Sequence, residues 1–440
     1  MRRILAFACL ISAWSAISAQ ETRSGITQPE PLLLYMLDLV IGNARIIDGT
    51  GSVFEQGAIV VRDGTIAAIS TNVADAEAPI YIDAAGMTVL PGFIDTHRHL
   101  LPSQFINSDE ALARWLDEGL PAELQNYLAA GLTTIMSTGD YFPAILEVRQ
   151  RIEDGELQGP RLISSGSNFS APEGHPSVSV FGRNPWGGAH HTNAVADPEA
   201  ARATVRELSD AGVDAIKVIY DGGQDDVWPR LDETVLAAIA DEARAHSLPT
   251  MVHVHGVEEL VTAVELGATR FVHMPYRGSI ADAQAARLLR EASIPIATTV
   301  GIRAPITDAA GGIGRTPGAG RVEFTPLRQM YLTQMLDNLR TLWDAGVIVA
   351  FGTDTASLRP AAAIAHEIRT LNEVLTAAEI ITALTKNAAQ FLGRSEDIGT
   401  LEPGKFADIV IIDGDPLTDI SSLANVVLVI KAGKIVVDNR

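Results

Sequence analysis

Val89-Leu90-Pro91-Gly92-Phe93-Ile94-Asp95-Thr96-His97-Arg98-His99 is the stretch that decides the fold of this chain. An apolar run with strand character ends there in two histidines that are two residues apart. Because side chains alternate across a strand, His97 and His99 face the same way and can reach one metal ion. Two histidines at this spacing also occur on solvated strands, so the prediction depends on the remainder of the chain.

Apolar strand-like runs and helical patterns alternate through the middle of the chain. The strand candidates are 88–96, 132–138, 161–165, 215–220, 250–254, 269–273, 295–300 and 347–352. Helical patterns separate them at 197–211, 231–245 and 257–266, among others, and Asp197-Pro198-Glu199 has the composition of a helix start. Eight strands with helical crossovers predict an α/β chain with a (β/α)8 TIM-like barrel. An open doubly wound sheet is the alternative.

Both flanks of this region are β-rich. Residues 57–69 predict a hairpin that turns at Asp63-Gly64, and the C-terminal part offers a strand at 407–413 and a second hairpin at 426–437. Neither flank is large enough for a good core alone. We therefore expect one small β-sandwich domain from 20–90 and 395–440, with the barrel at 91–394.

Composition and the N-terminus limit the possible partners. The formal charge of −21 argues against a nucleic acid or an anionic membrane as partner. Arg2 and Arg3, the apolar run 4–17 and the small residues Ser18-Ala19 predict a signal peptide at 1–19 and export to the periplasm or the medium. The run is shorter than the ~20 residues of a membrane span. Cys9 is the only cysteine, so the mature chain would have neither disulfides nor thiolate ligands.

Further ligand-type side chains end other strand candidates. His253 and His255 end the fifth, His273 the sixth and Asp354 the eighth, while Lys217 lies inside the otherwise apolar fourth. Parallel barrel strands deliver such residues to one catalytic face. A single histidine at a strand end is usually solvated or satisfied in the core, and Asp354 could cap a helix, but the gathering of all these residues favours a metal site. A buried lysine is costly unless it is paired or modified, and a carbamate would make Lys217 an anionic ligand.

Two connections in the predicted barrel are unusually long. Residues 166–196 follow the third strand and 301–324 follow the seventh, and both are rich in glycine. Long irregular loops in a compact domain are commonly functional. We expect these loops to overhang the catalytic face.

The ensemble resembles the amidohydrolase superfamily, in its imidazolonepropionase-like and Xaa-Pro dipeptidase-like branch. The matching pieces are PGFIDTHRH at 91–99, GLTTIMSTG at 131–139, GPRLISSG at 159–166, AIKVIYDGG at 215–223, VHVHG at 252–256, FVH at 271–273, FGTDT at 351–355 and GTLEPGKFADIVIIDGDP at 399–416. Together they span nearly the whole mature chain. The family's barrel carries a sandwich built from both chain ends, which agrees with the two flanks.

The resemblance implies a role for each ligand residue. His97, His99 and Asp354 would bind the more buried of two divalent ions, His253 and His273 would bind the second, and carboxylated Lys217 would bridge them. His255 shares the inward face with His253, so register could exchange the two. Zinc is the expected ion, although these ligand types also admit manganese or cobalt. A metal-bridging hydroxide would be the nucleophile, and Asp354 would carry its proton to the leaving nitrogen.

Several residues depart from the family pattern. Relatives of the dipeptidase type have a GGHGD-like segment after strand three, where this chain has Glu173-Gly174-His175-Pro176-Ser177, and Met136-Ser137 replaces Arg-Asp in strand two. His175, Tyr220, His255 and Arg303 are the candidates for substrate contact. His190 and His191 are expected to be solvated loop residues.

We expect a binuclear hydrolase of amide bonds in small carboxylate-bearing substrates, such as dipeptides or N-acyl amino acids. A lactone, ester or cyclic-amide hydrolase on the same site is the alternative. The strand-four lysine disfavours a mononuclear deaminase, the complete ligand set disfavours a non-catalytic binding relative, and the strand pattern disfavours a two-lobed solute-binding protein. An exposed barrel flank leaves room for a homo-oligomer.

Overall fold

The computed structural model describes residues 39–70, 78–102, 106–223, 225–280, 284–306, 324–354 and 358–440. The predicted signal peptide and most of the predicted loop 301–324 lie outside these residues. Within them, no helix combines the length and the apolar character that crossing a membrane requires.

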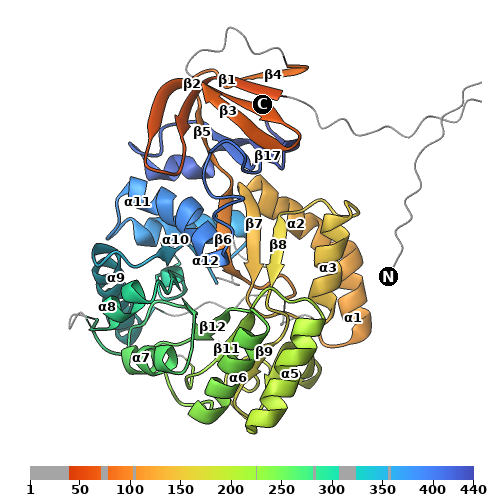
Figure 1. The fold of residues 1–440 in the computed structure, drawn as a ribbon, viewed down its shortest axis with the longest axis vertical. Coiled ribbons are helices and arrows are strands. Elements are labelled where there is room, and N and C mark those ends of the chain that lie inside the picture. The colour runs from red at the N-terminus through yellow and green to blue at the C-terminus, as the bar shows by residue number, and fades with distance from the viewer. Residues whose placement is uncertain are drawn as a thin grey trace, which may run out of the picture. The chain divides into compact units, whose positions relative to one another are not determined.

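Strands from both ends of the chain form one mixed sheet (Figure 1). Its strands are β1 (Leu39–Ile47), β2 (Val53–Arg62), β3 (Thr65–Ser70), β4 (Ile80–Asp83), β5 (Thr88–Pro91), β16 (Ile409–Ile412), β17 (Val426–Lys431) and β18 (Lys434–Asp438). Their order is β18-β17-β16-β5-β1-β2-β3, with β4 paired to β1. The central strand β5 runs parallel to β1 and antiparallel to β16, so it joins the N-terminal and C-terminal strands.

Both faces of this sheet are buried at its central strands β5 and β16, as alternation along β16 shows. Ile409 and Ile411 belong to a core made by the mixed sheet itself, whereas Val410 and Ile412 belong to the large core of the chain. The two predicted hairpins are confirmed. They turn at Asp63-Gly64 and Ala432-Gly433, where all four residues have positive φ, as tight hairpin turns require.

The remaining strands form two parallel sheets. One has three strands, β6 (Phe93–Arg98), β7 (Leu132–Ser137) and β8 (Arg161–Ser164). The other has the order β10 (Thr192–Ala194), β9 (Asn168–Ser170), β11 (Ile216–Ile219), β12 (Thr250–His253), β13 (Arg270–Val272), β14 (Ile296–Ala297) and β15 (Val349–Ala350). Backbone hydrogen bonds link the two sheets at both edges of the three-stranded one, from Thr96 N in β6 to Phe351 O after β15 at 3.0 Å and from Asp214 N before β11 to Ser164 O in β8 at 2.8 Å.

Helices connect and flank the parallel strands (Figure 1). They are α1 (Asp109–Arg114), the π-helix η1 (Trp115–Gly119), α2 (Leu120–Ala129), α3 (Ala144–Glu153), α4 (Pro185–His191), α5 (Pro198–Asp210), α6 (Glu233–Ala245), α7 (Val257–Glu265), α8 (Gln284–Glu291), the 3-10 helix η2 (Val300–Ile302), α9 (Pro326–Asp344), α10 (Pro360–Leu371), α11 (Ala377–Thr382), the π-helix η4 (Ala383–Asn387), α12 (Ala388–Leu392) and the 3-10 helix η5 (Ile420–Ala424). The predicted start of α5 is confirmed, because Asp197 Oδ1 accepts a hydrogen bond from Ala200 N at 2.8 Å.

The first predicted strand of the middle region is in fact two strands, which corrects the expectation of one run over 88–96. β5 ends at Pro91 in the mixed sheet, and β6 begins at Phe93 in a parallel sheet. Gly92 lies between them and donates its N–H to Asp408 O at 2.7 Å. A Cβ on Gly92 would lie 2.1 Å from Thr133 Oγ1, so only glycine fits this crossing point.

The connection 166–196 is also more regular than expected. It contains β9, α4 and β10, and β9 extends the seven-stranded sheet by pairing with both β10 and β11. Apolar and aromatic side chains of the connection explain this order. Phe169 and Phe181 are both buried in the large core.

A largely buried ion pair ties the mixed sheet to β8. Arg161 Nη1 donates to Asp408 Oδ2 at 2.6 Å and to Thr134 Oγ1 at 3.1 Å, while Asp408 Oδ1 accepts from Ala432 N at 2.8 Å. The side chain of Asp408 is only 4% exposed. Breaking such a pair leaves one charge without its partner, which is much more costly than losing a surface pair.

We therefore expect Asp408→Asn to lower the free energy of unfolding by about 2 to 4 kcal/mol. The matched control is Asp438→Asn, because Asp438 pairs with Arg440 at 2.7 Å on the surface, with side chains 41% and 38% exposed. The control should leave the unfolding midpoint nearly unchanged, because an exposed ion pair contributes little to stability. Urea unfolding followed by circular dichroism measures both, and equal midpoints for the two variants would contradict the assignment.

Candidate metal centre

His97, His99 and Asp354 form the first group of ligand-type side chains. His97 is in the last part of β6, His99 follows that strand, and Asp354 follows β15. Asp354 Oδ1 lies 3.4 Å from His99 Nε2 and 3.7 Å from His97 Nε2. The three side chains converge closely enough to hold one metal ion. Two imidazoles and a carboxylate suit zinc and related divalent ions.

A buried carboxylate fixes the backbone that carries this group. Asp95 accepts hydrogen bonds from His97 N at 3.0 Å, Thr353 N at 3.1 Å and Thr353 Oγ1 at 2.6 Å. Asp354 N in turn donates to His97 O at 3.0 Å. Asp354 has a φ of 45°, and such backbone strain in a residue other than glycine is common at functional sites.

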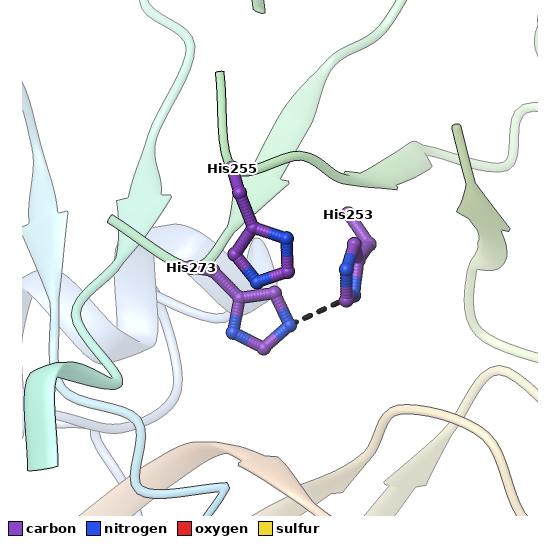
Figure 2. Close-up of side chains that lie close together, drawn as sticks. All are labelled: His253, His255 and His273. Atoms are coloured by element: carbon purple, nitrogen blue, oxygen red, sulfur yellow. Dashed lines mark hydrogen bonds between the residues drawn. The ribbon is translucent and has the colours of Figure 1, made fainter. Parts of the chain in front are cut away.

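Three histidines form the second group, and Figure 2 shows their rings facing one another. His253 ends β12, His255 lies two residues later, and His273 follows β13. His273 Nε2 lies 2.9 Å from His253 Nδ1, and its Nδ1 lies 2.8 Å from Thr299 Oγ1. His273 has a φ of 71°, so both groups contain a residue with a strained backbone.

Asp221 orients His255 within the second group. Asp221 Oδ2 accepts from the backbone N–H of His255 and lies 3.1 Å from His255 Nδ1. The same oxygen accepts from Arg277 Nη2 at 3.2 Å. Burial alone would raise the pKa of Asp221, but His255 and Arg277 lower it below its ordinary value. The ionised carboxylate therefore holds His255 Nδ1 as the protonated nitrogen and directs Nε2 away from itself.

Lys217 lies close enough to residues of both groups to interact with them electrostatically. It is in β11, its side chain is only 1% exposed, and it lines the same cavity as the histidines. Burial lowers the pKa of Lys217 to about 7, although the charge of Asp354 opposes this shift. A large fraction of Lys217 is therefore an uncharged amine near neutral pH, which is the form that reacts with carbon dioxide.

The two groups are neighbours. The ring centroids of His97 and His273 are 4.7 Å apart, and His273 Nδ1 lies 3.9 Å from Asp354 Oδ2. Burial, together with the charge of Lys217, lowers the pKa of His97, His253 and His273 well below the ordinary histidine value. These imidazoles are therefore neutral, and each has one nitrogen lone pair, as a metal ligand must.

Buried atoms without protein partners show that the site fits metal ions. Within the described ranges, His97 Nδ1 and His253 Nε2 are buried and have no hydrogen-bond partner. Buried polar groups normally have partners, because each unpaired group costs free energy. The donor set is entirely nitrogen and carboxylate oxygen, which agrees with a divalent ion in each group.

The predicted ligand residues all line one cavity of about 700 Å³. The residues of the two groups and Lys217 that line this cavity are His97, His99, Lys217, His253, His255, His273 and Asp354. His175 lines the cavity as well, and its ring centroid is 5.2 Å from that of His253. The structure thus brings together eight of the ten predicted site residues.

Tyr220 and Arg303, the other two candidates for substrate contact, stay predictions. In the described part of the chain, neither Tyr220 nor Arg303 is among the residues that line the cavity. Tyr220 directly follows β11, the strand of Lys217. Arg303 is buried, donates to the Tyr276 hydroxyl and lies 4.6 Å from the centre of the Tyr276 ring.

Three residues of the site were not predicted from the sequence. His191 was expected to be solvated, but it is buried beside Phe181 and lines the cavity. Only the tertiary packing of the connection 166–196 reveals this. Asp221 follows the strand of Lys217 by two residues, and its partner His255 is 34 residues away. Asp140 pairs with Leu100 and Leu101 through their backbone N–H groups, and no local pattern shows this.

Comparison with known proteins agrees with this geometry. The profile of the amidohydrolase family matches residues 88–436. Ochratoxinase of Aspergillus niger is 28% identical over 433 residues, which cover 89% of this chain and 85% of the relative. Imidazolonepropionase of Geobacillus sp. (strain WCH70) is 24% identical over 398 residues, or 82% of this chain and 84% of the relative.

A solved structure is similar in fold over most of the chain. It is a Xaa-Pro dipeptidase with bound methionine in its active site, with a TM-score of 0.74 and 24% identity over 90% of this chain and 99% of that one. The family profile covers β5 through β18 and therefore includes both ligand groups and Lys217. With two convergent ligand groups on a chain that the profile matches over most of its length, this protein belongs to the amidohydrolase family and is a hydrolase.

Proposed function

We propose that this protein is a binuclear metal-dependent hydrolase that cleaves amide bonds of small carboxylate-bearing substrates, such as dipeptides and N-acyl amino acids. The observation that carries the proposal is the adjacency of the two ligand groups, whose nearest rings are 4.7 Å apart, with Lys217 buried beside both. Two ions held this close act on one substrate bond.

In this proposal, His97, His99 and Asp354 would hold one ion, His253 and His273 would hold the second, and carboxylated Lys217 would be a ligand shared by both. When bound, divalent ions such as zinc lower the pKa of water and polarise a carbonyl group. Hydrolysis adds the water oxygen to the acyl carbon and breaks the carbon–nitrogen bond, and the nitrogen takes a proton. Asp354 is the proton carrier, because its carboxylate faces the cavity at the meeting point of the two groups.

His255 and His175 are proposed to contact the substrate. Asp221 already occupies the Nδ1 side of His255, so Nε2 is the nitrogen that remains for a ligand in the cavity. His175 Nδ1 lies 2.6 Å from Ser179 Oγ, which similarly leaves its Nε2. Arg359 is an exposed cation at the N-cap of α10 that lines the same cavity, and it supports recognition of a carboxylate there.

The proposal includes the finer features of the fold. We propose that the two parallel sheets form one (β/α)8 barrel, because backbone hydrogen bonds link them at both edges. The mixed sheet would be the small sandwich domain of 20–90 and 395–440, and the segment 1–19 would direct export. The dipeptidase relative acts on dipeptides by its name, which supports amide cleavage here. Lactones, esters and cyclic amides present the same carbonyl and are the alternative substrates.

The first test is metal content together with a substrate panel. We expect about two divalent ions per chain by elemental analysis of protein purified without chelator, because two ligand groups are present. The panel contains dipeptides, N-acyl amino acids and lactones of matched size. Turnover of the amides supports the proposal, turnover of lactones alone favours the alternative, and one ion or none without turnover contradicts both.

Replacing Lys217 tests the bridge. Lys217→Ala should lower the metal content below one ion per chain and abolish turnover, because the anionic ligand shared by both groups is lost. Short carboxylic acids should restore part of the activity by taking the place of the carbamate. Lys431→Ala is the control: Lys431 is also partly buried, and burial lowers its pKa to about 8, but it donates to Gly159 O away from the cavity. Full turnover of Lys217→Ala would exclude the carbamate.

Replacing Asp354 tests the proton carrier. Asp354→Asn keeps an oxygen ligand but cannot accept a proton, so we expect at least one bound ion and a kcat reduced by about 10² to 10⁴. Asp419→Asn, at an exposed helix N-cap, is the control and should retain the parent kcat. Steady-state kinetics and elemental analysis on the same samples measure both effects. Unchanged turnover in Asp354→Asn would remove this residue as the base.

A further inference from the structure

The cavity has an apolar side as well as a polar one. Away from the ligand groups it is lined by Leu100, Leu101, Trp115, Val180, Phe181 and Ile302. A cavity that served only small polar substrates would gain nothing from this surface, because apolar walls stabilise apolar ligands by removing their surface from water. The apolar side chains of this wall therefore indicate that part of the substrate is apolar.

One helical face supplies much of this wall. Trp115, Gly119, Ala122, Glu123 and Asn126 all line the cavity, and their spacing of three or four residues places them on one side of the continuous helix α1-η1-α2. Asp117 and Glu118, which lie between Trp115 and Gly119 in the sequence, are exposed. The helix widens to a π-helix over Trp115–Gly119, and such bulges are frequent at functional sites.

Gly119 has no side chain, and this leaves room for the indole of Trp115. A Cβ at Gly119 would lie 2.3 to 2.9 Å from ring atoms of Trp115, so the indole rests directly on the backbone of the next turn. The backbone of Gly119 has φ of −92° and ψ of −45°, which any residue adopts. Glycine is therefore required here by space alone, although it is among the poorest helix formers. Any larger residue at this position would displace the ring from the helix.

A second part of the wall, Leu100 and Leu101, is held in place by hydrogen bonds to the buried carboxylate of Asp140. Leu100 N and Leu101 N donate to the two carboxylate oxygens of Asp140 at 2.9 and 3.0 Å, and Ser137 Oγ donates to the same carboxylate at 2.7 Å. Asp140 is completely buried. These leucines directly follow His99, so the apolar wall begins at the first ligand group and keeps a fixed position relative to it.

From these contacts we propose that the cavity selects substrates whose acyl group is large, flat and apolar, with Trp115 as the specificity-determining residue and Gly119 as the residue that positions its ring. This inference rests on the proposed amide hydrolysis. The acyl group would pack on the Trp115 indole and on Leu100 and Leu101, with its carbonyl directed to the ligand groups. Aromatic surfaces in such a pocket contribute both buried area and ring packing.

Two substrates that differ only in the acyl group test the proposal. N-(2-naphthoyl)glycine has a large flat acyl group, N-acetylglycine has a small one, and both release glycine. The measured quantity is the ratio of kcat/KM for the first to kcat/KM for the second. The variants are Trp115→Ala, Gly119→Ala and Trp115→Phe, and Asp117→Ala on the exposed side of the same π-helix is the matched control.

We expect the parent enzyme to prefer the naphthoyl substrate. Trp115→Ala and Gly119→Ala should each lower the ratio by about tenfold or more, the first by removing the ring and the second by displacing it. Trp115→Phe keeps an aromatic surface and should retain most of the preference, and Asp117→Ala should leave the ratio unchanged. A parent preference for N-acetylglycine, or a ratio that Trp115→Ala does not move, would overturn the proposal. Metal content and circular dichroism identify a variant that failed to fold.

Product binding separates this proposal from the proposed function. Calorimetric titration with 2-naphthoate and with acetate needs no turnover. If the parent binds 2-naphthoate more tightly than acetate, and Trp115→Ala weakens 2-naphthoate binding about tenfold, the role of the apolar wall is supported. This holds even if neither amide is hydrolysed, and in that case only the proposed reaction is contradicted. Equal affinity of parent and variant for 2-naphthoate would overturn the proposed role of Trp115 in substrate selection, even if both amides are hydrolysed.

Discussion

Desolvation of neutral nitrogen ligands is the constraint on which the rest of this structure depends. His97, His253, His273 and Lys217 are all buried in one cavity, and their burial lowers the pKa of each group. A cluster of cations at these distances would repel itself, so the fold tolerates the cluster only when these groups are neutral. Neutral imidazoles with free lone pairs are metal ligands, so the same burial that makes the cluster tolerable also prepares it for divalent ions.

Carboxylates in the interior give this cluster its geometry. Asp95 binds the backbone on both sides of the first group, Asp140 binds the two residues that follow His99, and Asp221 binds His255. Each joins segments that are far apart in the sequence. Burial raises the pKa of Asp95 to about 6, so only above that pH is its carboxyl fully ionised and able to accept hydrogen bonds on both oxygens. The ligands are thus positioned by strands and by a second layer of hydrogen bonds.

The sequence predicted the parts of the site that depend on strand periodicity. Histidines at strand ends, Lys217 within an apolar run and the two hairpin turns all follow from local patterns, because alternation and turn chemistry are properties of a few neighbouring residues. Contacts between residues that are far apart in the sequence could not be predicted in this way. His191 is buried only because the connection 166–196 folds onto Phe181, and Arg303 lies against Tyr276, which is 27 residues away. No short window of sequence contains such contacts.

The crossing at Gly92 has a thermodynamic consequence. One residue separates β5, the central strand of the mixed sheet, from β6, which carries His97. A shift of either strand along its sheet would displace the other strand, because Gly92 packs tightly against Thr133 and the connection has no further residues. An ion bound only by the native arrangement of His97 and His99 would therefore also protect the terminal strands against unfolding. Metal affinity and the stability of the terminal strands are therefore linked. A substitution that destabilises the C-terminal hairpin β17-β18 would also weaken metal binding.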